Sequence, residues 1–530
     1  MSIVSPHTLG FRCLVLAGVL AVEGLLLSWT FEGQTGPVAG GPAGAIRIWA
    51  PWMARGAVAF AVVFAAIAWL RFRHIFEATA PKWRPAFAGA HVLCLTLFYG
   101  ATQDIYNTQG SRLSAIVWCT GMVFVTASAA LAAAPPSCWL QVLRKARSLW
   151  ILALVSSAVS LATVPMLQSL WLPASKLTFS IVAVMLRPFV GERMILRPER
   201  LQIGVKGFSV IIAPECSGLE GIGLLLVFGV VGTFLFRKEL RFPNCLALFP
   251  IGIVVLFFFN ALRIAALVLI GHWGAKGIAA GGFHSQAGWL AFNGVAFGLC
   301  LVGQRWPFVW KDRPPAPKPA AVDSTSAFLL PFVAVLFAGM LSRAMSSNFE
   351  WAYGLRVLLV ASVLWYFRRA YAGLDWRPGW PAVAAGITVF FLWIGLDRLA
   401  GTPSAGLPGP LAQAPPGLRW FWILTRSLGA IVTVPVAEEL AFRAFLYRRL
   451  QSPEFDQLAL TRFSWFALLA SSAAFGVMHG SRWPAGILAG IAYAMAMQAR
   501  GRFGDAVFAH SLTNALISAA VIGAGQWQLW

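Results

Sequence analysis

Long apolar runs separated by short polar segments recur along the whole chain of 530 residues. About 20 consecutive apolar residues are enough for a helix to cross the ~30 Å hydrocarbon core of a bilayer. The pattern therefore predicts an all-α, polytopic transmembrane helical protein with roughly sixteen candidate helices, some of them short or re-entrant. The clear ones cover 11–29, 57–71, 112–134, 150–170, 217–236, 246–270, 287–303, 326–345, 351–367, 462–480 and 505–525.

The chain is 59% hydrophobic and only 11% charged, whereas soluble domains contain about 25% charged residues. Its formal net charge of +22 would suggest nucleic-acid binding in a soluble protein, but here the basic residues gather in short loops, in the positive-inside pattern of membrane topology. The segments "FEGQTGPVAGG" and "TQDIYNTQG" lack Lys and Arg and are expected as loops on the extracytoplasmic side. We therefore expect a multi-pass protein of the cell inner (plasma) membrane that does not bind nucleic acid. The basic loops lie at 71–74, 144–147, 236–242, 311–318 and 367–369.

A proline-rich, charged segment, "RWPFVWKDRPPAPKPAAVDSTS", separates two apolar halves. Prolines spaced in this way favour an extended, semi-rigid connector. All seven cysteines precede the segment, and only two histidines, His479 and His510, follow it. We therefore predict two helical membrane domains in series, 1–305 and 326–530, joined by a linker at 306–325.

Three polar residues of the first half are expected at one depth of the membrane. With the basic loops on the inner side, the helix at 246–270 runs outward, and about 25 Å of helical rise places Arg263 in the outer half of the bilayer. Cys216 opens a helix that runs inward from the outer side, and His284 precedes the last helix of this half. The stretch 172–215 is expected to be irregular and to lie on or partly in the outer side of the membrane.

Arg263 is the most informative of the three. A charge within an apolar helix costs about 2.5 kcal/mol or more, so such a residue is by default functional or paired. Asn260 lies one turn earlier on the same helical face and could orient the guanidinium. By contrast, a cysteine at a helix start is more often a packing residue, and a histidine in a Gly-rich loop is more often a polar loop residue.

Together, the three side chains could perform nucleophilic catalysis. A helix N-terminus and a neighbouring cation both favour the thiolate form of Cys216. His284 could act as general base or acid, and Arg263 could stabilise the oxyanion of a tetrahedral intermediate. Glu215 and Glu220 oppose thiolate formation, so they would have to point away or pair with a cation.

The stretches "APECSGLEG", "NALRI" and "GFHSQAGW", in this order, resemble the three signature blocks of the exosortase/archaeosortase family of membrane cysteine transpeptidases. The resemblance covers about 150–305. It implies that Cys216 is the nucleophile and that Arg263 and His284 are its partners. It also implies exported substrates with a short motif before a C-terminal transmembrane anchor, which are cut through a thioester whose acyl group can pass to another nucleophile.

In the second half, the stretch "TVPVAEELAFRAFLYRRL" places two adjacent carboxylates directly after an apolar run. Glu439 and Arg443 lie four residues apart, hence on one helical face, and can form an ion pair. Glu438 is turned by about 100° from Glu439 and is therefore free to face another group.

Both histidines of the second half belong to pairs spaced by four residues. "FGVMHG" places Phe475 and His479 on one helical face, and "HSLTNAL" places His510 and Asn514 on another. Such groups could form a polar network that only holds helices together. That alternative does not explain why both histidines fall in such pairs.

These stretches resemble the E-E-x-x-x-R, F-x-x-x-H and H-x-x-x-N signature of the CPBP family of intramembrane proteases, which contains type II CAAX prenyl endopeptidases and bacteriocin-processing enzymes. The resemblance covers about 326–530. It implies that Glu438 and His479 activate a water by general-base chemistry. It further implies that His510 and Asn514 hold the oxyanion.

The same resemblance assigns Glu439 and Arg443 to bracing the site. A zinc site is an alternative, because Glu and His are common zinc ligands. It ranks below the metal-free interpretation, because HExxH is absent and the ligands would come from three helices. We therefore expect neither a metal nor a cofactor.

A fusion of these two domain types resembles the exosortase E/protease type, which is associated with substrates that carry a VPEID-CTERM tail. We predict a bifunctional membrane peptidase whose first half processes C-terminal sorting signals with Cys216 and whose second half cleaves peptides through Glu438. The expected partners are exported proteins with such a tail, and membrane lipid. One alternative is a non-catalytic scaffold or transporter that keeps both polar clusters as contacts between helices. Another leaves only the second half active and makes the first half a receptor for the tail.

Overall fold

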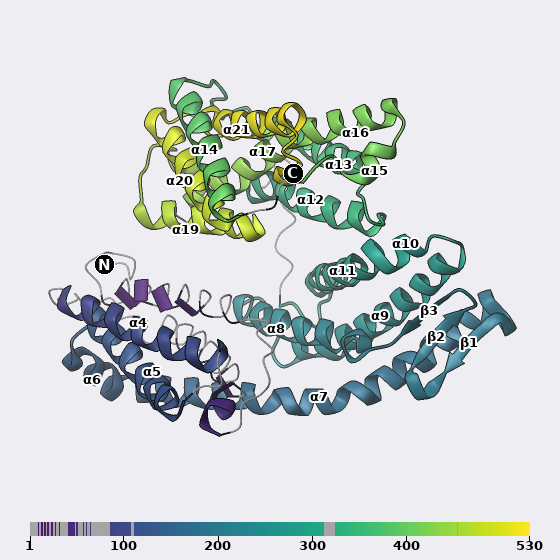
Figure 1. Cartoon of the computed structure of the whole chain (residues 1–530), viewed down its shortest axis with the longest axis horizontal. Helices are drawn as coiled ribbons and strands as arrows, with labels where there is room; N and C mark the ends of the chain where they lie inside the picture. The colour runs from purple at the N-terminus through teal and green to yellow at the C-terminus, as the bar shows by residue number, and fades with distance from the viewer. Residues whose placement is uncertain are drawn as a thin grey trace. The chain divides into compact units, whose positions relative to one another are not determined.

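The protein is built almost entirely of helices, as the apolar pattern predicts (Figure 1). Eight of the helices described are long and apolar enough to cross a membrane. The chain divides into two compact units, residues 1–170 and 171–530. The predicted helices at 11–29 and 57–71 lie largely outside the described residues. This computed structural model describes residues 85–530 except 108–110, 312–323, 402, 404 and 453, together with scattered residues among the first 84.

In the first unit, α4 and α5 pack against each other. His91 of α4 is buried at their contact, where its Nδ1 lies 3.2 Å from Oγ of Ser128 in α5 and its Nε2 lies 3.0 Å from Oε1 of Glu23. Both ring nitrogens therefore have partners in an apolar interior. The helices of this unit are α4 (Pro85–Asn107), α5 (Arg112–Ala133), α6 (Pro136–Lys145) and the first part of α7 (Arg147–Val190).

The segment "TQDIYNTQG" is not a loop throughout, because α4 continues into it as far as Asn107. Ile105 is fully buried there. Arg47 donates from Nε to the carbonyl of Ile105 at 2.6 Å and from Nη2 to that of Tyr106 at 3.1 Å. These bonds satisfy carbonyls that the end of a helix leaves without partners. The polar residues of the last turn conceal this helix in the sequence.

The stretch 172–215 was expected to be irregular, and this prediction is wrong. Helix α7 continues as far as Val190. Val182, Leu186 and Val190 recur at every fourth position and are all buried, so one face of the helix packs into a core. Arg187 is the one charged residue between Val182 and Val190, and Ser169–Arg193 is apolar enough to cross a membrane.

A small antiparallel sheet follows α7, with the strand order β1-β2-β3. The connection between the last two strands contains Gly207, whose φ of +93° is rarely adopted by residues with a side chain. Ile203 and Val205 of the middle strand are buried against Ala261 and Ile264 of helix α9, and this packing supports a sheet too small to be stable alone. The strands are β1 (Met194–Arg197), β2 (Gln202–Val205) and β3 (Phe208–Ile211), preceded and interrupted by the short turns η1 (Gly191–Arg193) and η2 (Pro198–Arg200).

Three long helices, α8, α9 and α11, complete the first half and pack around Leu225, Leu256 and Val295. Short turns precede each of them. The elements are η3 (Pro214–Ser217), α8 (Leu219–Leu235), η4 (Asn244–Ala247), α9 (Leu248–His272), α10 (Lys276–Ile278), η5 (Ala279–Phe283) and α11 (His284–Arg305).

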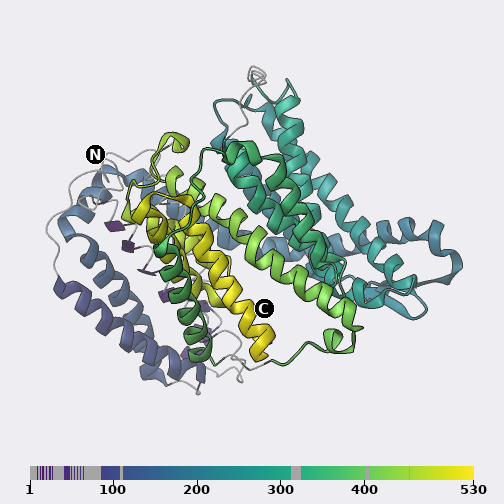
Figure 2. The same ribbon diagram turned by 90° about the horizontal axis from the view of Figure 1, so that it is seen from above.

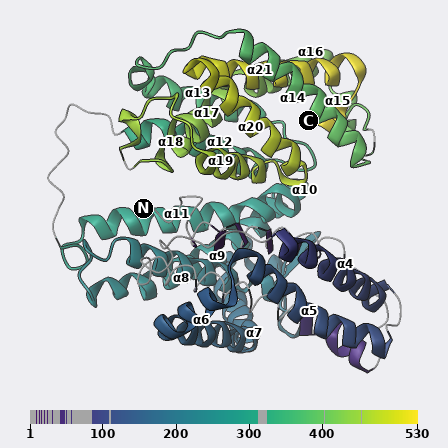
Figure 3. The same cartoon turned by 90° about the vertical axis from the view of Figure 1, so that its left-hand side faces the viewer.

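The second half is a helical bundle that can be followed in Figures 2 and 3. Its core joins α12, α14 and the helices from α17 to α21. Residues 416–449 form one continuous helical stretch that includes two π-helical segments. Its elements are α12 (Ser324–Ala344), α13 (Tyr353–Tyr366), η6 (Arg368–Tyr371), α14 (Trp380–Leu399), α15 (Gly409–Gln413), α16 (Pro416–Leu428), η7 (Gly429–Thr433), α17 (Val434–Glu439), η8 (Leu440–Leu446), α18 (Tyr447–Arg449), η9 (Phe455–Gln457), α19 (Trp465–Val477), η10 (Gly480–Arg482), α20 (Trp483–Arg500), α21 (Phe503–Ala524) and η11 (Trp527–Leu529).

Candidate active sites

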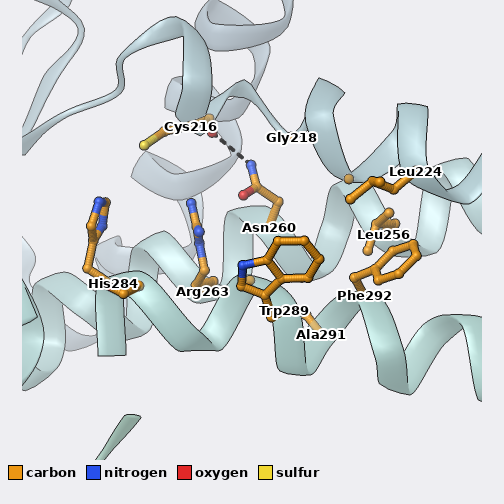
Figure 4. A pocket seen from close by; sticks show the side chains of 13 residues that line it. Cys216, Gly218, Leu224, Leu256, Asn260, Arg263, His284, Trp289, Ala291 and Phe292 are labelled. Carbon is orange, nitrogen blue, oxygen red and sulfur yellow. Dashed lines mark hydrogen bonds between the residues drawn. The ribbon is translucent and has the colours of Figure 1, made fainter. Parts of the chain in front are cut away.

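Cys216, Arg263 and His284 come from three separate elements: η3, α9 and the first residue of α11. All three line one cavity of about 270 Å³. Figure 4 shows the thiol, the guanidinium and the imidazole directed toward the same space. The structure therefore brings together the three residues that the sequence placed at a common depth.

Cys216 does not open a long helix, in contrast to the prediction. It lies in the one-turn 3-10 helix η3, and α8 begins after it at Leu219. Gly218 separates the two elements with a φ of +89°, a left-handed conformation that stops a right-handed helix and that glycine adopts without strain. The thiol is thus presented from a tight turn between the sheet and α8.

Asn260 holds this turn against α9. Its Nδ2 donates to the carbonyl of Cys216 at 2.9 Å. The sequence had suggested that Asn260 orients the guanidinium of Arg263; the hydrogen bond that its amide makes is to the backbone of the cysteine turn. Gly218 allows the approach, because a Cβ at that position would lie only 3.0 Å from Nδ2 of Asn260. One face of α9 therefore positions both the cysteine turn and Arg263.

The guanidinium of Arg263 is not fully hydrogen-bonded within the described part of the protein. Its Nε is buried and has no hydrogen-bond partner among the residues that the structure describes. Gly288 of α11 makes room for the group, since a Cβ at that position would lie 2.9 Å from Nη1. A guanidinium can only donate hydrogen bonds. The site therefore offers a positive donor to an oxygen atom that enters the cavity.

The polar residues of the second half meet at another cavity, of about 180 Å³. Glu438 of α17, His479 after α19, and His510 and Asn514 of α21 line it. Glu439 is not part of the lining. The two adjacent carboxylates therefore occupy different environments, as their rotation around the helix predicts.

Glu439 is held between two partners inside the protein. Its side chain is 0% exposed, and its Oε2 lies 2.9 Å from Nε of Arg443, which confirms the predicted ion pair. Its Oε1 lies 2.9 Å from Nδ1 of His510. Nη2 of Arg443 donates to the carbonyl of Gly490 at 3.2 Å. This arrangement ties three helices together, because a buried charge is tolerated only with such partners.

Glu438 is the less constrained carboxylate. Its Oε2 is buried and has no hydrogen-bond partner in the described part of the chain. The same oxygen lies 3.9 Å from Nε2 of His510, beyond direct hydrogen-bonding distance. Glu438 also lines the cavity, so its carboxylate can accept a proton from a water molecule there.

The hydrogen bonds of the two histidines define which ring nitrogen faces the cavity. Nδ1 of His479 lies 2.8 Å from the carbonyl of Phe475, and because a carbonyl only accepts, this nitrogen carries the hydrogen. Nδ1 of His510 donates to Glu439 by the same reasoning. Nε2 of each ring is therefore left for chemistry in the cavity.

Several residues around this cavity carry no sequence motif. Tyr493 stacks on His510 with ring centroids 4.9 Å apart, and Trp393 contacts His479 at 5.5 Å. Nδ2 of Asn514 donates to the carbonyl of Ala430 at 2.7 Å; the amide keeps a second hydrogen for another acceptor. Arg426 also lines the cavity. Sequence spacing could not identify Tyr493, Trp393 or Arg426, because they come from other helices.

Groups of three or more His, Cys, Asp or Glu residues arranged to hold a metal ion do not occur among the described residues.

Two cavities lined by polar side chains lie in a protein with helices long and apolar enough to cross a membrane, and comparison with known families gives its class. Residues 51–302 match the family model of a transmembrane exosortase. Residues 420–516 match that of a type II CAAX prenyl endopeptidase, Rce1-like. No curated protein and no solved structure matches the chain.

The chain is therefore a multi-pass membrane peptidase. It carries an exosortase domain and a CAAX-protease domain in series, as the sequence blocks predicted. The first match contains the cysteine cavity residues, and the second contains the glutamate cavity residues from Glu438 to Asn514. The domain limits 1–305, 306–325 and 326–530 remain predictions.

Proposed function

We propose that the protein is a bifunctional peptidase of the cell inner (plasma) membrane. The first half cleaves C-terminal sorting signals through Cys216, and the second is an intramembrane endopeptidase that depends on Glu438. The observation that carries the proposal is that each family match contains a cavity where its candidate residues meet. Its substrates are exported proteins with a sorting motif and a transmembrane anchor.

In the first site, His284 accepts the thiol proton and the thiolate of Cys216 attacks the carbonyl carbon of the scissile bond. The oxyanion forms beside Arg263, whose guanidinium lines the cavity and can donate to it. The C–N bond then breaks, His284 returns the proton to the leaving amine, and a thioester remains on Cys216. Water or an amine attacks this thioester and regenerates the thiol.

In the second site, Glu438 and His479 remove a proton from water, and the resulting hydroxide attacks the peptide carbonyl. In this step His510 carries a hydrogen on both ring nitrogens, so that Nδ1 donates to Glu439 while Nε2, together with Nδ2 of Asn514, donates to the oxyanion. The proton then passes to the leaving amine as the C–N bond breaks. Glu439 and Arg443 keep His510 in place through the 2.9 Å contacts on either side of Glu439.

A division of labour follows from the covalent fusion. The first site releases the exported protein from its tail, and the second site trims or degrades the anchor peptide that remains. The anchor peptide that the first reaction leaves behind stays in the membrane that holds the second site. It is therefore available to the second reaction without leaving the bilayer.

Mass spectrometry of a substrate tagged at both ends tests this scheme. We expect wild-type cells to contain a new C-terminus before the anchor and no lasting anchor fragment. Cys216→Ala should leave the substrate uncut, and Glu438→Ala should give the same new C-terminus with an accumulated anchor. Anchor turnover in Glu438→Ala cells equal to that of wild type would rule out the division of labour. Normal processing in Cys216→Ala cells would rule out the cysteine mechanism.

We expect Asn260→Leu to slow processing of the tail about tenfold while the protein stays folded. Leucine has a similar volume but no donor, so the carbonyl of Cys216 loses its 2.9 Å hydrogen bond to α9. Such a bond is worth about 1 kcal/mol, and a tenfold change in rate corresponds to about 1.4 kcal/mol. The measurement is kcat/KM for a tagged substrate in proteoliposomes.

The matched control is Asn293→Leu, because the amide of Asn293 donates to the carbonyl of Trp289 on its own helix. Equal losses in the two variants would indicate general damage. An unchanged rate in Asn260→Leu would contradict the role of Asn260 in positioning the cysteine turn.

A further inference from the structure

The turn that precedes His284 has an unusual geometry. Residues 279–283 form the π-helical turn η5, in which Gly281 departs from helical geometry with φ −93° and ψ −107°. His284 is the next residue and the first of α11. The shape of η5 therefore determines where the imidazole lies relative to Cys216 and Arg263.

This turn is seated on residues of the second half, within the compact unit formed by residues 171–530. The N–H of Gly282 donates to the carbonyl of Ser346 at 3.1 Å. A Cβ at position 282 would overlap the carbonyl oxygen of Arg343 and would lie 2.5 Å from that of Ser346. A Cβ at Gly277 would lie 3.0 Å from Cβ of Ser347. Only glycine allows backbones to approach so closely.

The receiving turn is fixed by bonds within its own half. The N–H of Ser346 donates to the carbonyl of Arg343 at 3.0 Å, and its Oγ donates to the carbonyl of Ser342 at 2.6 Å. Oγ of Ser342 in turn donates to Glu350 and accepts from Nε of Arg356 at 2.9 Å. Arg356 also forms an ion pair with Glu350 at 2.7 Å. A partly buried network of this kind makes the turn a stiff support.

We propose that residues 343–347 of the protease half position His284 for the reaction of the exosortase half. This inference rests on the function proposed for Cys216 and His284. Gly282 and Ser346 are positioning residues, since they act through His284 and do not touch the substrate. Misplacing a catalytic group by about 1 Å can cost about 100-fold in rate, so the first site depends on the second half for its full activity.

The alternative is an ordinary packing contact that supports stability alone. The Gly282→Ala variant in the full chain distinguishes a positioning role from a packing contact. Its Cβ meets backbone oxygens that cannot rotate away, so η5 must shift. We expect kcat for tail processing to fall about 100-fold with KM changed by less than about twofold, while Glu438-dependent turnover of a separately supplied anchor peptide persists.

The matched control is Gly298→Ala, on α11, where a Cβ meets no atom within 4 Å; it should behave as wild type. Unchanged processing in Gly282→Ala would overturn the proposal. Equal loss of both activities in that variant would overturn it too, because a merely structural contact predicts that result.

A crosslink tests the contact without any assay of activity. Gly277→Cys and Ser347→Cys are combined in a chain with a protease site inserted between 312 and 323. The Cβ separation of 3.0 Å needs only a small adjustment to the ~3.8 Å of a disulfide. After cleavage, we expect the two fragments to remain joined until reduction.

The Gly277→Cys variant alone, and the pair Gly298→Cys with Ser347→Cys, are expected to separate into two fragments. Failure of the main pair to crosslink would overturn the contact, whatever the role of Cys216. If the crosslink forms but Cys216→Ala still processes the tail, the proposed function fails and the contact stands.

Discussion

Replacing Cys216 by alanine is expected to abolish processing of the sorting tail while the protein remains folded and inserted in the membrane. No other group of the first cavity can form the thioester, and in hydrolases removal of the nucleophile costs about 10⁶-fold in turnover. The substitution removes one sulfur atom from a half-buried position at a cavity, so it leaves no new void in a packed core. Processing is measured from the ratio of cut to uncut substrate.

The control for this experiment is Cys245→Ala. Cys245 is 1% exposed and packs with Leu240 and Val309, so its loss affects packing and not chemistry. A substrate should be trapped covalently on Cys216 and not on Cys245. If the first half were only a receptor for the tail, no thioester would form on either cysteine. A non-catalytic scaffold or transporter would leave processing unchanged in both variants.

Local patterns were sufficient to predict much of the fold and part of the second site. Apolar runs predicted α5, α9 and α12, because a membrane helix must bury its own backbone hydrogen bonds in a continuous apolar segment. The pair of Glu439 and Arg443 followed from spacing alone, since residues four apart share a helical face. Both predictions depend on neighbours in sequence.

The features that the sequence did not predict depend on distant partners. The second part of α7 was expected to be irregular, although Ser169–Arg193 is apolar enough to cross a membrane; its helix places Val182 and Leu186 in one core with the distant Ile203. Asn260 was expected to orient Arg263 one turn away, but its amide donates instead to the carbonyl of Cys216, 44 positions earlier in the chain. The contact of Gly282 with Ser346 joins segments on either side of the proline-rich linker. None of these partners is fixed by spacing along the chain.

Burial separates the adjacent carboxylates of the second site into a structural and a chemical group. Glu439 has a buried cation on one side and an imidazole on the other, whereas Glu438 lines a cavity. Isosteric replacement by glutamine removes the charge from each in turn without a change of volume. We therefore expect the Glu438 variant to lose activity and the Glu439 variant to lose stability.

Glu438→Gln is expected to stay as stable as wild type and to cleave about 10³-fold more slowly, because glutamine cannot accept the proton of water and general-base catalysis contributes about 10² to 10⁴-fold.

Glu439→Gln is expected to lose about 3–5 kcal/mol of stability, because the guanidinium of Arg443, 1% exposed, is left as a buried charge without its counterion. Anchor-peptide turnover in proteoliposomes measures the first effect, and thermal melting in detergent measures the second. Full activity in Glu438→Gln would exclude it as the base, and a wild-type melting temperature in Glu439→Gln would exclude the bracing role of the ion pair.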